Sequence, residues 1–202
     1  MHRILVCLAV LLSLAGCAAD SKWASDADVA RARYVADGPP SITLFTVVNN
    51  RSNAGAHSGL LINASQRVMF DPAGTWHHPS LPERHDVHYG ITDKMVLFYI
   101  DYHARETFRV IEQKLVVTPQ QAEIALQRAQ GYGAVPKAEC ARSVSTILGG
   151  VPGFESISTT WYPNKLMTAF GALPGVTQRT ITDSDADNNH GVLLVQAGQP
   201  AG

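Results

Sequence analysis

The sequence has few charged residues and almost no excess of either sign. Of its 202 residues 16% are charged, and 16 Lys and Arg stand against 17 Asp and Glu, for a net charge of -1. Without a basic excess there is no electrostatic footprint for a phosphate backbone, so nucleic acid is excluded as an expected partner. Because 46% of the residues are hydrophobic, an intrinsically disordered chain is also excluded, and the length suits one domain with a substantial core.

Several motifs and residue types are scarce or missing. The chain has no glycine-rich phosphate loop and no Gly-x-Ser-x-Gly elbow, so neither nucleotide chemistry nor a serine hydrolase is indicated. Only three cysteines occur, Cys7, Cys17 and Cys140, which are too few for a disulfide scaffold. We expect no cofactor and no bound metal.

The longest apolar run lies at the N-terminus. Arg3 precedes residues 4–15, a twelve-residue run that only Ser13 interrupts. This is shorter than the ~20 residues needed to span a bilayer, but it suits the core of a signal peptide. The run ends Leu14-Ala15-Gly16-Cys17, which resembles the lipobox of bacterial lipoproteins. An ordinary secretory signal that contains a cysteine is the alternative.

The lipobox resemblance implies that residues 1–16 are a lipoprotein signal peptide and that Cys17 carries the lipid that anchors the chain to the membrane. In this group Ala18, in place of Asp, favours the outer membrane of the bacterial envelope, facing the periplasm. Residues 17–40, small and polar and rich in turn formers at their end, are expected to be a tether. Cys140 is then the only free thiol of an exported protein, either buried and inert or kept for its reactivity.

Residues 41–175 are predicted to form an α+β domain, an antiparallel sheet of about five strands with packed helices. Residues 176–202 are expected to be a polar C-terminal tail, loose from Asp183 onward. The expected strands are residues 42–48, 56–62, 67–70, 94–102 and 108–117, and the expected helices are 119–130, 140–148 and 164–170.

The hairpin of the second and third expected strands brings polar residues together. A register that sets Leu60 opposite Val68 makes one face mostly apolar, and it sets His57 opposite Asp71 on the other face. A carboxylate beside an imidazole is a base with the acid that orients it. Cys140 opens a predicted helix, where unpaired N–H groups and the helix dipole favour the thiolate, and its own N–H is available to an oxyanion.

A histidine strand, a hairpin, a polar residue after the return strand and a later cysteine helix resemble the NlpC/P60 superfamily. The chain order His57, Asp71, Cys140 is more similar to its circularly permuted, papain-like branch, which includes lecithin retinol acyltransferase relatives. Over roughly residues 42–148 the resemblance implies a circularly permuted papain-like fold with Cys140 as nucleophile, His57 as base and Asp71 as third member. Tyr132 is a loose match to the tyrosine that assists the oxyanion in unpermuted members.

The stretch around the nucleophile, Glu139-Cys140-Ala141-Arg142-Ser143, departs from the family, in which Asp or Asn commonly precedes the cysteine and Ser follows it. The resemblance implies a thiol hydrolase, similar to cysteine peptidases and amidases, that cleaves amide bonds of cell-wall peptides through an acyl-enzyme. The alternatives are a lipid acyltransferase or esterase of the same fold, and a catalytically silent lipoprotein that serves as an envelope binding or scaffold module.

Two further clusters have compositions typical of ion sites. His77, His78, His85 and His88, with Asp86 among them, have a composition that suits zinc but no regular spacing, so we interpret them as a polar loop at the rim of the site.

Residues 183–187 alternate Asp with small residues, as a calcium loop does at its start. An EF-hand needs Gly and Glu where this chain has Asn188 and Leu194, so we interpret the segment as a solvated acidic tail.

Overall fold

The computed structural model describes residues 19 and 21–198 of the chain. The predicted signal peptide, the lipobox and the lipidated Cys17 lie outside these residues. The described part is α+β, with one seven-stranded antiparallel sheet and six helices, which confirms the predicted fold class. Within the described ranges, no helix combines the length and the apolar character that a membrane crossing requires.

The sheet has two more strands than expected, in the order β4-β5-β3-β2-β1-β6-β7. Three strands were missed because they are very short or exposed and therefore show little alternation, and one expected strand is a helix. The strands are β1 (Ser41–Asn49), β2 (Gly55–Asn63), β3 (Arg67–Phe70), β4 (Glu83–Arg84), β5 (Val87–Tyr89), β6 (Phe108–Val116) and β7 (Thr177–Ile181).

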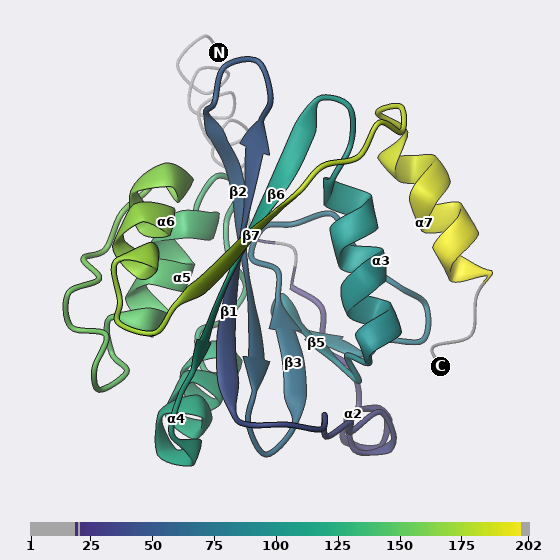
Figure 1. Ribbon diagram of the computed structural model, residues 1–202. Coiled ribbons are helices and arrows are strands. Elements are labelled where there is room, and N and C mark those ends of the chain that lie inside the picture. The colour runs from purple at the N-terminus through teal and green to yellow at the C-terminus, as the bar shows by residue number, and fades with distance from the viewer. Residues whose placement is uncertain (1–18, 20, 199–202) are drawn as a thin grey trace, which may run out of the picture.

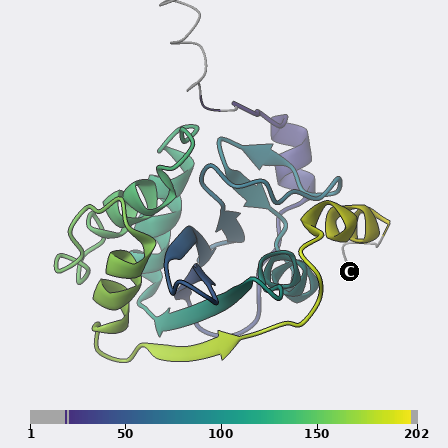
Figure 2. The ribbon, with the colours of Figure 1, turned by 90° about the horizontal axis from the view of Figure 1, so that it is seen from above.

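Helices cover both faces of the sheet, as Figures 1 and 2 show. One face carries α4 (Pro119–Gln130), α5 (Cys140–Leu148) and α6 (Pro163–Gly171), and the other carries α3 (Asp93–His103) with α7 (Asn189–Ala197) packed on it. A short helix, α2 (Asp26–Arg31), precedes the sheet. Two hydrophobic cores follow from this arrangement, because alternate residues of each strand point to opposite faces.

The expected strand at residues 94–102 is wrong, because this segment belongs to helix α3. A run of apolar and β-branched residues is typical of a buried strand, but here burial follows the helical period: Met95 and Tyr99 are buried, whereas Leu97 is 61% exposed. Thr92 caps the helix by accepting a hydrogen bond from the N–H of Met95.

The predicted register of the β2–β3 hairpin is wrong by two residues. Leu60 lies opposite Phe70, not Val68, and Val68 lies opposite Ile62. A shift of two preserves the face of every side chain, because the side-chain period of a strand is two. His57 and Asp71 therefore share the predicted face, but they meet diagonally and not directly across the ladder.

The segment expected to be a tether is folded against the sheet. Within residues 21–40, Trp23 forms a bridge with Arg84 of β4, and the carbonyl of Tyr34 accepts a hydrogen bond from the N–H of Arg67. Backbone hydrogen bonds to strand edges, which composition does not reveal, hold this segment in place.

The C-terminal segment is also ordered where a loose tail was expected. β7 pairs with β6, and α7 docks on α3 through Gln196, which is 2% exposed. The Gln196 side chain accepts from the indole N–H of Trp76 and donates to the carbonyl of Phe98. The acidic stretch between the two elements is attached as well, since Asp185 pairs with the buried Arg105 at 3.2 Å.

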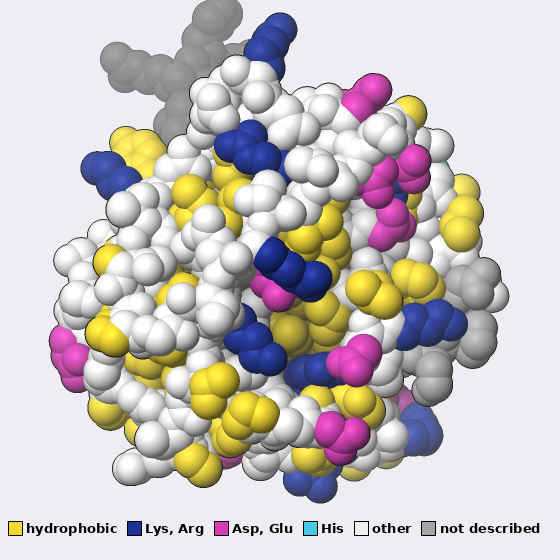
Figure 3. All heavy atoms as spheres, in the orientation of Figure 1, with side chains coloured by type: hydrophobic (Ala, Val, Ile, Leu, Met, Phe, Trp, Pro, Cys, Tyr) yellow, Lys and Arg dark blue, Asp and Glu magenta, His cyan; other side chains and the backbone are white. Residues whose placement is uncertain are grey.

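The sheet face under α3 is not fully covered toward β7. A hollow of about 270 Å³ lies there, and Phe45 and Leu61 form part of its lining. Figure 3 shows hydrophobic side chains at this place, with Lys, Arg and acidic side chains around them. The ion pair of Arg179 with Glu112, at 2.7 Å, lies in this lining.

Helix α4 begins, as predicted, after the capping residue Thr118, and this cap is expected to contribute to the free energy of unfolding. Thr118 accepts from the N–H of Gln121, whose side chain in turn accepts from the N–H of Thr118, which is a capping box. We expect Thr118→Ala to lower the free energy of unfolding by about 1 kcal/mol in urea titrations. Thr168→Ala is the matched control, since that hydroxyl only bonds a carbonyl within α6. An equal effect of the two variants would contradict the capping role.

Candidate active site

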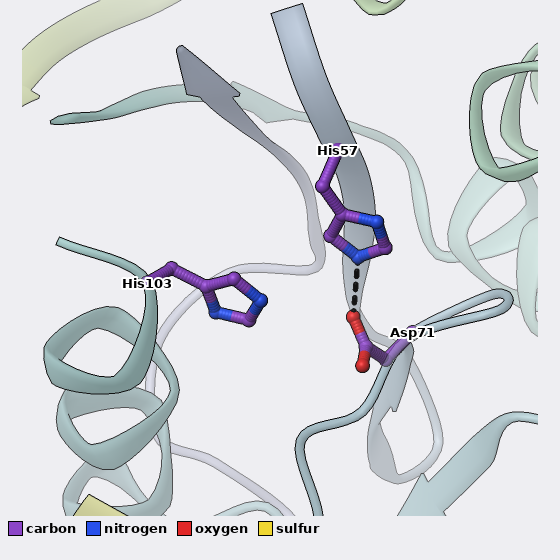
Figure 4. A group of neighbouring side chains, drawn as sticks. All are labelled: His57, Asp71 and His103. Carbon is purple, nitrogen blue, oxygen red and sulfur yellow. Dashed lines mark hydrogen bonds and ion pairs between the residues drawn. The ribbon is translucent and has the colours of Figure 1, made fainter. Parts of the chain in front are cut away.

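The site is built on a buried pair of polar side chains. His57, near the start of β2, approaches Asp71 through Nε2, which lies 2.7 Å from the carboxylate Oδ1 (Figure 4). The Asp71 side chain has no exposed surface and that of His57 is 15% exposed. Because Nε2 is bound to the carboxylate, Nδ1 of the ring is left for another partner.

Cys140 is the first residue of α5, as predicted, and it is 7% exposed. Its thiol lies within hydrogen-bonding reach of the His57 imidazole. The structure therefore brings together the three predicted catalytic residues, which come from β2, the turn after β3 and the N-terminus of α5.

The short length of β3 admits the thiol to the edge of β2. β3 ends at Phe70 opposite Leu60, so the earlier residues of β2 have no strand partner on that side. α5 packs against β2, and the backbone N–H of Ser58 lies close enough to the Cys140 sulfur to lower the pKa of the thiol. The backbone N–H of Ala141 acts on the same sulfur.

These contacts shift the titration of both partners. Burial would raise the pKa of the Cys140 thiol, but the hydrogen bond and charge of His57, with the N–H groups of Ser58 and Ala141, bring that pKa below its ordinary value. Burial would lower the pKa of His57, yet the charge and hydrogen bond of Asp71, reinforced by Cys140, raise it to about 10. Both shifts favour the thiolate form of Cys140 and the imidazolium form of His57.

Asp71 stays ionised although it is buried. Burial would raise the pKa of Asp71, but the charge and hydrogen bond of His57 hold it well below its usual range. The hydroxyl of Tyr99 also donates to Oδ1, at 2.9 Å. Gly59 makes room for this hydroxyl, since a Cβ on Gly59 would lie 2.1 Å from it.

Sequence reasoning missed two residues of the site, Tyr99 and His103. Both lie on α3, whose incorrect prediction as a strand separated them from Asp71. The stacked rings of His103 and His57 are nearly parallel, with centroids 5.5 Å apart. A signal was present, because Met95, Tyr99 and His103 recur every four residues after a capping Thr92.

The role expected of Tyr132, assistance to an oxyanion, stays a prediction. Its ring packs edge-on against Phe70, with centroids 6.1 Å apart, at the core on the α4–α6 side. Among the described residues, Tyr132 has no hydrogen bond with Cys140 or His57, so its geometry gives no support for a role in oxyanion binding.

The histidine-rich stretch does not converge on one point. His78 is buried, with Nε2 2.7 Å from the carbonyl of Gln196, whereas His77 is exposed. His88 is buried against Trp76, and His85 packs beside Trp23. Most of the stretch is thus divided between core packing and the N-terminal segment, and does not form the expected rim loop.

A cavity of about 380 Å³ opens beside the imidazole pair. His57 and His103 lie in its wall with the hydroxyl groups of Thr75 and Tyr102, which are 2.7 Å apart. Its lining contains no Lys, Arg, Asp or Glu. The volume is within the range of small-molecule sites.

Comparison with protein-family models, with curated protein sequences and with solved structures finds no match to this chain. The interpretation of the site therefore depends on its own geometry.

The close contact of Gly59 with Tyr99 predicts energetic coupling. We expect Gly59→Ala to lower the free energy of unfolding by about 1 to 3 kcal/mol through overpacking. In a Tyr99→Phe background the same change should cost at least about 0.5 kcal/mol less, because the obstructing oxygen is gone. Urea unfolding of the double-mutant cycle measures this. Tyr102→Phe is the matched control: its hydroxyl contacts Thr75, so it should be additive with Gly59→Ala. Additivity in the Tyr99 cycle would refute the coupling.

Burial of the Asp86 carboxyl group is expected to make the free energy of unfolding depend on pH. Burial raises the pKa of Asp86 to about 6, although the N–H of Val135 donates to its carboxylate at 2.7 Å. The folded state thus holds this proton more tightly than the unfolded state, so stability is lost as pH rises through about 6.

Asp86→Asn keeps an acceptor for Val135 and removes the charge. We expect this variant to be more stable than the wild type by about 1 to 3 kcal/mol at pH 8, with the difference vanishing near pH 4. Urea unfolding across this range measures it, with the exposed Asp37→Asn as a surface control. A difference that does not change with pH would contradict the assigned cause.

Proposed function

We propose that the protein is a thiol hydrolase in which Cys140 is the nucleophile, His57 the proton carrier and Asp71 the residue that orients His57. The observation that carries this proposal is the convergence of a thiol, at the N-terminus of a helix, with an imidazole whose other nitrogen is bound to a fully buried carboxylate. Each of these features favours an activated thiolate.

The reaction follows from the two nitrogens of His57. The Cys140 thiolate attacks the carbonyl carbon of an amide, and a carbon–sulfur bond forms as the carbonyl π electrons move to oxygen. His57 then gives its Nδ1 proton to the leaving amine, and the carbon–nitrogen bond breaks to leave a thioester. Water, deprotonated by the now neutral His57, hydrolyses the thioester and restores the thiolate and imidazolium pair.

The N–H of Cys140 supports stabilisation of the oxyanion. It lies at the N-terminus of α5, and among residues 19 and 21–198 it has no hydrogen-bond partner. The helix N-cap, Glu139, supplies no side-chain cap either. A free N–H beside the nucleophile is a suitable donor to the oxygen that becomes negative during attack.

The chain order supports a circularly permuted papain-like domain of the NlpC/P60 type. In chain order the histidine strand β2 and its hairpin precede the cysteine helix α5. Helix α5 nevertheless packs directly against β2. Tyr99 and His103 arrive from α3, between the two parts.

For the substrate we propose amide bonds of cell-wall peptides. A cavity of about 380 Å³ adjoins His57, and Cys140 is not among its lining residues. The hydroxyl and amide groups in its wall, from Thr75, Tyr102 and Asn189, suit part of a short peptide better than a long acyl chain. An envelope lipoprotein, anchored by lipid on Cys17 and facing the periplasm from the outer membrane, would have this substrate at hand. A lipid acyltransferase is the alternative that the substrate test distinguishes.

Alkylation of Cys140 tests the proposal. Iodoacetamide labelling of the full chain is followed for the Cys140 peptide by mass spectrometry between about pH 5 and pH 9. The lowered thiol pKa predicts fast labelling near pH 6.5, where an ordinary thiol, with a pKa of about 8.5, reacts slowly. His57→Ala should slow labelling at that pH by at least about tenfold, because the imidazolium that stabilises the thiolate is lost.

The exposed His190→Ala is the matched control and should label like the wild type. If Cys140 resists labelling until denaturant is added, the catalytic proposal fails and a binding or scaffold role leads. For an activated thiol, acyl-enzyme trapping with synthetic cell-wall peptides and with diacyl lipids then separates the hydrolase from the lipid acyltransferase.

A further inference from the structure

A second function is indicated on the side of His57 that faces away from the thiol. Three side chains from three separate elements, His57, Asp71 and His103, each offer a ligand atom, and these atoms all lie within 4.8 Å of one another. Figure 4 shows the His103 ring at the end of α3, turned toward the pair formed by His57 and Asp71.

The hydrogen bonds around these residues orient them as ligands. Nδ1 of His103 donates to the carbonyl of Tyr99 at 2.8 Å, so the neutral ring presents the lone pair of Nε2. No described residue is hydrogen-bonded to that Nε2. Metal-binding histidines characteristically donate their other nitrogen in this way, which sets both the tautomer and the ring orientation.

The carboxylate of Asp71 is also oriented by a hydrogen bond and has one oxygen available. The Tyr99 hydroxyl holds Oδ1 of Asp71, whereas Oδ2, although fully buried, has no hydrogen-bond partner among the described residues. A buried carboxylate oxygen without a partner is costly, and coordination of a cation is one way to satisfy it.

The cavity beside the histidines leaves the site accessible. His57 and His103 both line it, and no Lys or Arg in its wall would repel a cation. Two imidazoles and one carboxylate, with an open fourth position for water, are a donor set that Zn²⁺ accepts, whereas Ca²⁺ and Mg²⁺ prefer oxygen ligands alone.

A second group of possible ligands in the described part of the chain consists of carboxylates alone and is already neutralised. Asp101, Asp183 and Asp185 also lie close together, but the buried Arg105 pairs with two of them, at 3.1 and 3.2 Å. The guanidinium already supplies the positive charge there, so the cluster needs no ion.

We propose that the protein binds one Zn²⁺-like transition-metal ion through Nε2 of His57, the carboxylate of Asp71 and Nε2 of His103, and that the bound ion inhibits the thiol reaction. The ion replaces the proton on Nε2 of His57, which is released to solvent, and no oxidation state changes. Inhibition rests on the proposed hydrolase function; ion binding does not.

The inhibition has a definite chemical reason. With an ion on Nε2, the His57 ring keeps only the proton on Nδ1. Giving that proton to the leaving amine would leave an imidazolate, a much stronger base than the neutral imidazole of the ion-free reaction. Acylation of Cys140 therefore slows while the ion is bound.

Calorimetric titration with ZnCl₂ tests the binding. The full chain is used without a histidine tag and with Cys7→Ser and Cys17→Ser, which remove the other two thiols. We expect one ion per chain, at least tenfold weaker binding in His103→Gln, and binding within twofold of the parent in the exposed His190→Gln. No stoichiometric binding, or an unchanged affinity in His103→Gln, would overturn the site.

Co²⁺ absorption of the parent chain gives a second measurement that needs no variant at the site. Ligands of nitrogen and oxygen give only weak visible bands, whereas a thiolate-to-cobalt charge-transfer band in the near ultraviolet would show that Cys140 is a ligand and would overturn the assignment.

Inhibition is measured separately, as acylation of Cys140 by a chromogenic ester with and without Zn²⁺. We expect at least tenfold slowing in the parent and relief in His103→Gln. Zinc binding without any acylation would refute the proposed hydrolase and leave the ion site standing. Acylation that zinc binding does not slow would refute inhibition alone.

Discussion

The carboxylate of Asp71 is fully buried, and the groups around it are those that make a buried charge tolerable. An isolated carboxylate in a protein interior is strongly unfavourable, and no Lys or Arg is paired with this one among the described residues. His57 supplies the opposite charge and the Tyr99 hydroxyl supplies a second hydrogen bond. Gly59 is required because any larger side chain would displace that hydroxyl. Burial of this one carboxylate therefore determines which residues can stand at Gly59 of β2 and at Tyr99 of α3.

On the other side of the imidazole, the shape of the sheet determines how the Cys140 thiol can approach. A full-length β3 would cover the edge of β2, and no helix could then reach its backbone. Because β3 ends at Phe70, the N–H of Ser58 is free to bind sulfur, and α5 delivers Cys140 to that point. The thiolate thus receives its stabilisation from a strand edge, a helix N-terminus and one imidazolium, and each of the three comes from a different part of the chain.

The two nitrogens of His57 connect the proposed chemistry with the proposed regulation. In the proposed chemistry Nδ1 serves the thiol, whereas Nε2 is bound to the carboxylate of Asp71 and lies near His103. A ring held on both sides transfers protons efficiently because its orientation does not change, yet the same arrangement leaves Nε2 open to competition between a proton and a metal ion. The same contacts of His57 thereby support both the proposed hydrolysis and the proposed ion binding.

Local patterns in the sequence were sufficient for α4, with its Thr118 cap, for α5 beginning at Cys140, and for the shared face of His57 and Asp71, since these depend on capping, helical spacing and the two-residue period of a strand. Only the tertiary structure decided the register, the helical state of residues 93–103 and hence the arrival of His103. An apolar run is compatible with a strand or a buried helix until its packing partners are known, and short edge strands such as β4 owe their pairing to neighbours distant in the sequence.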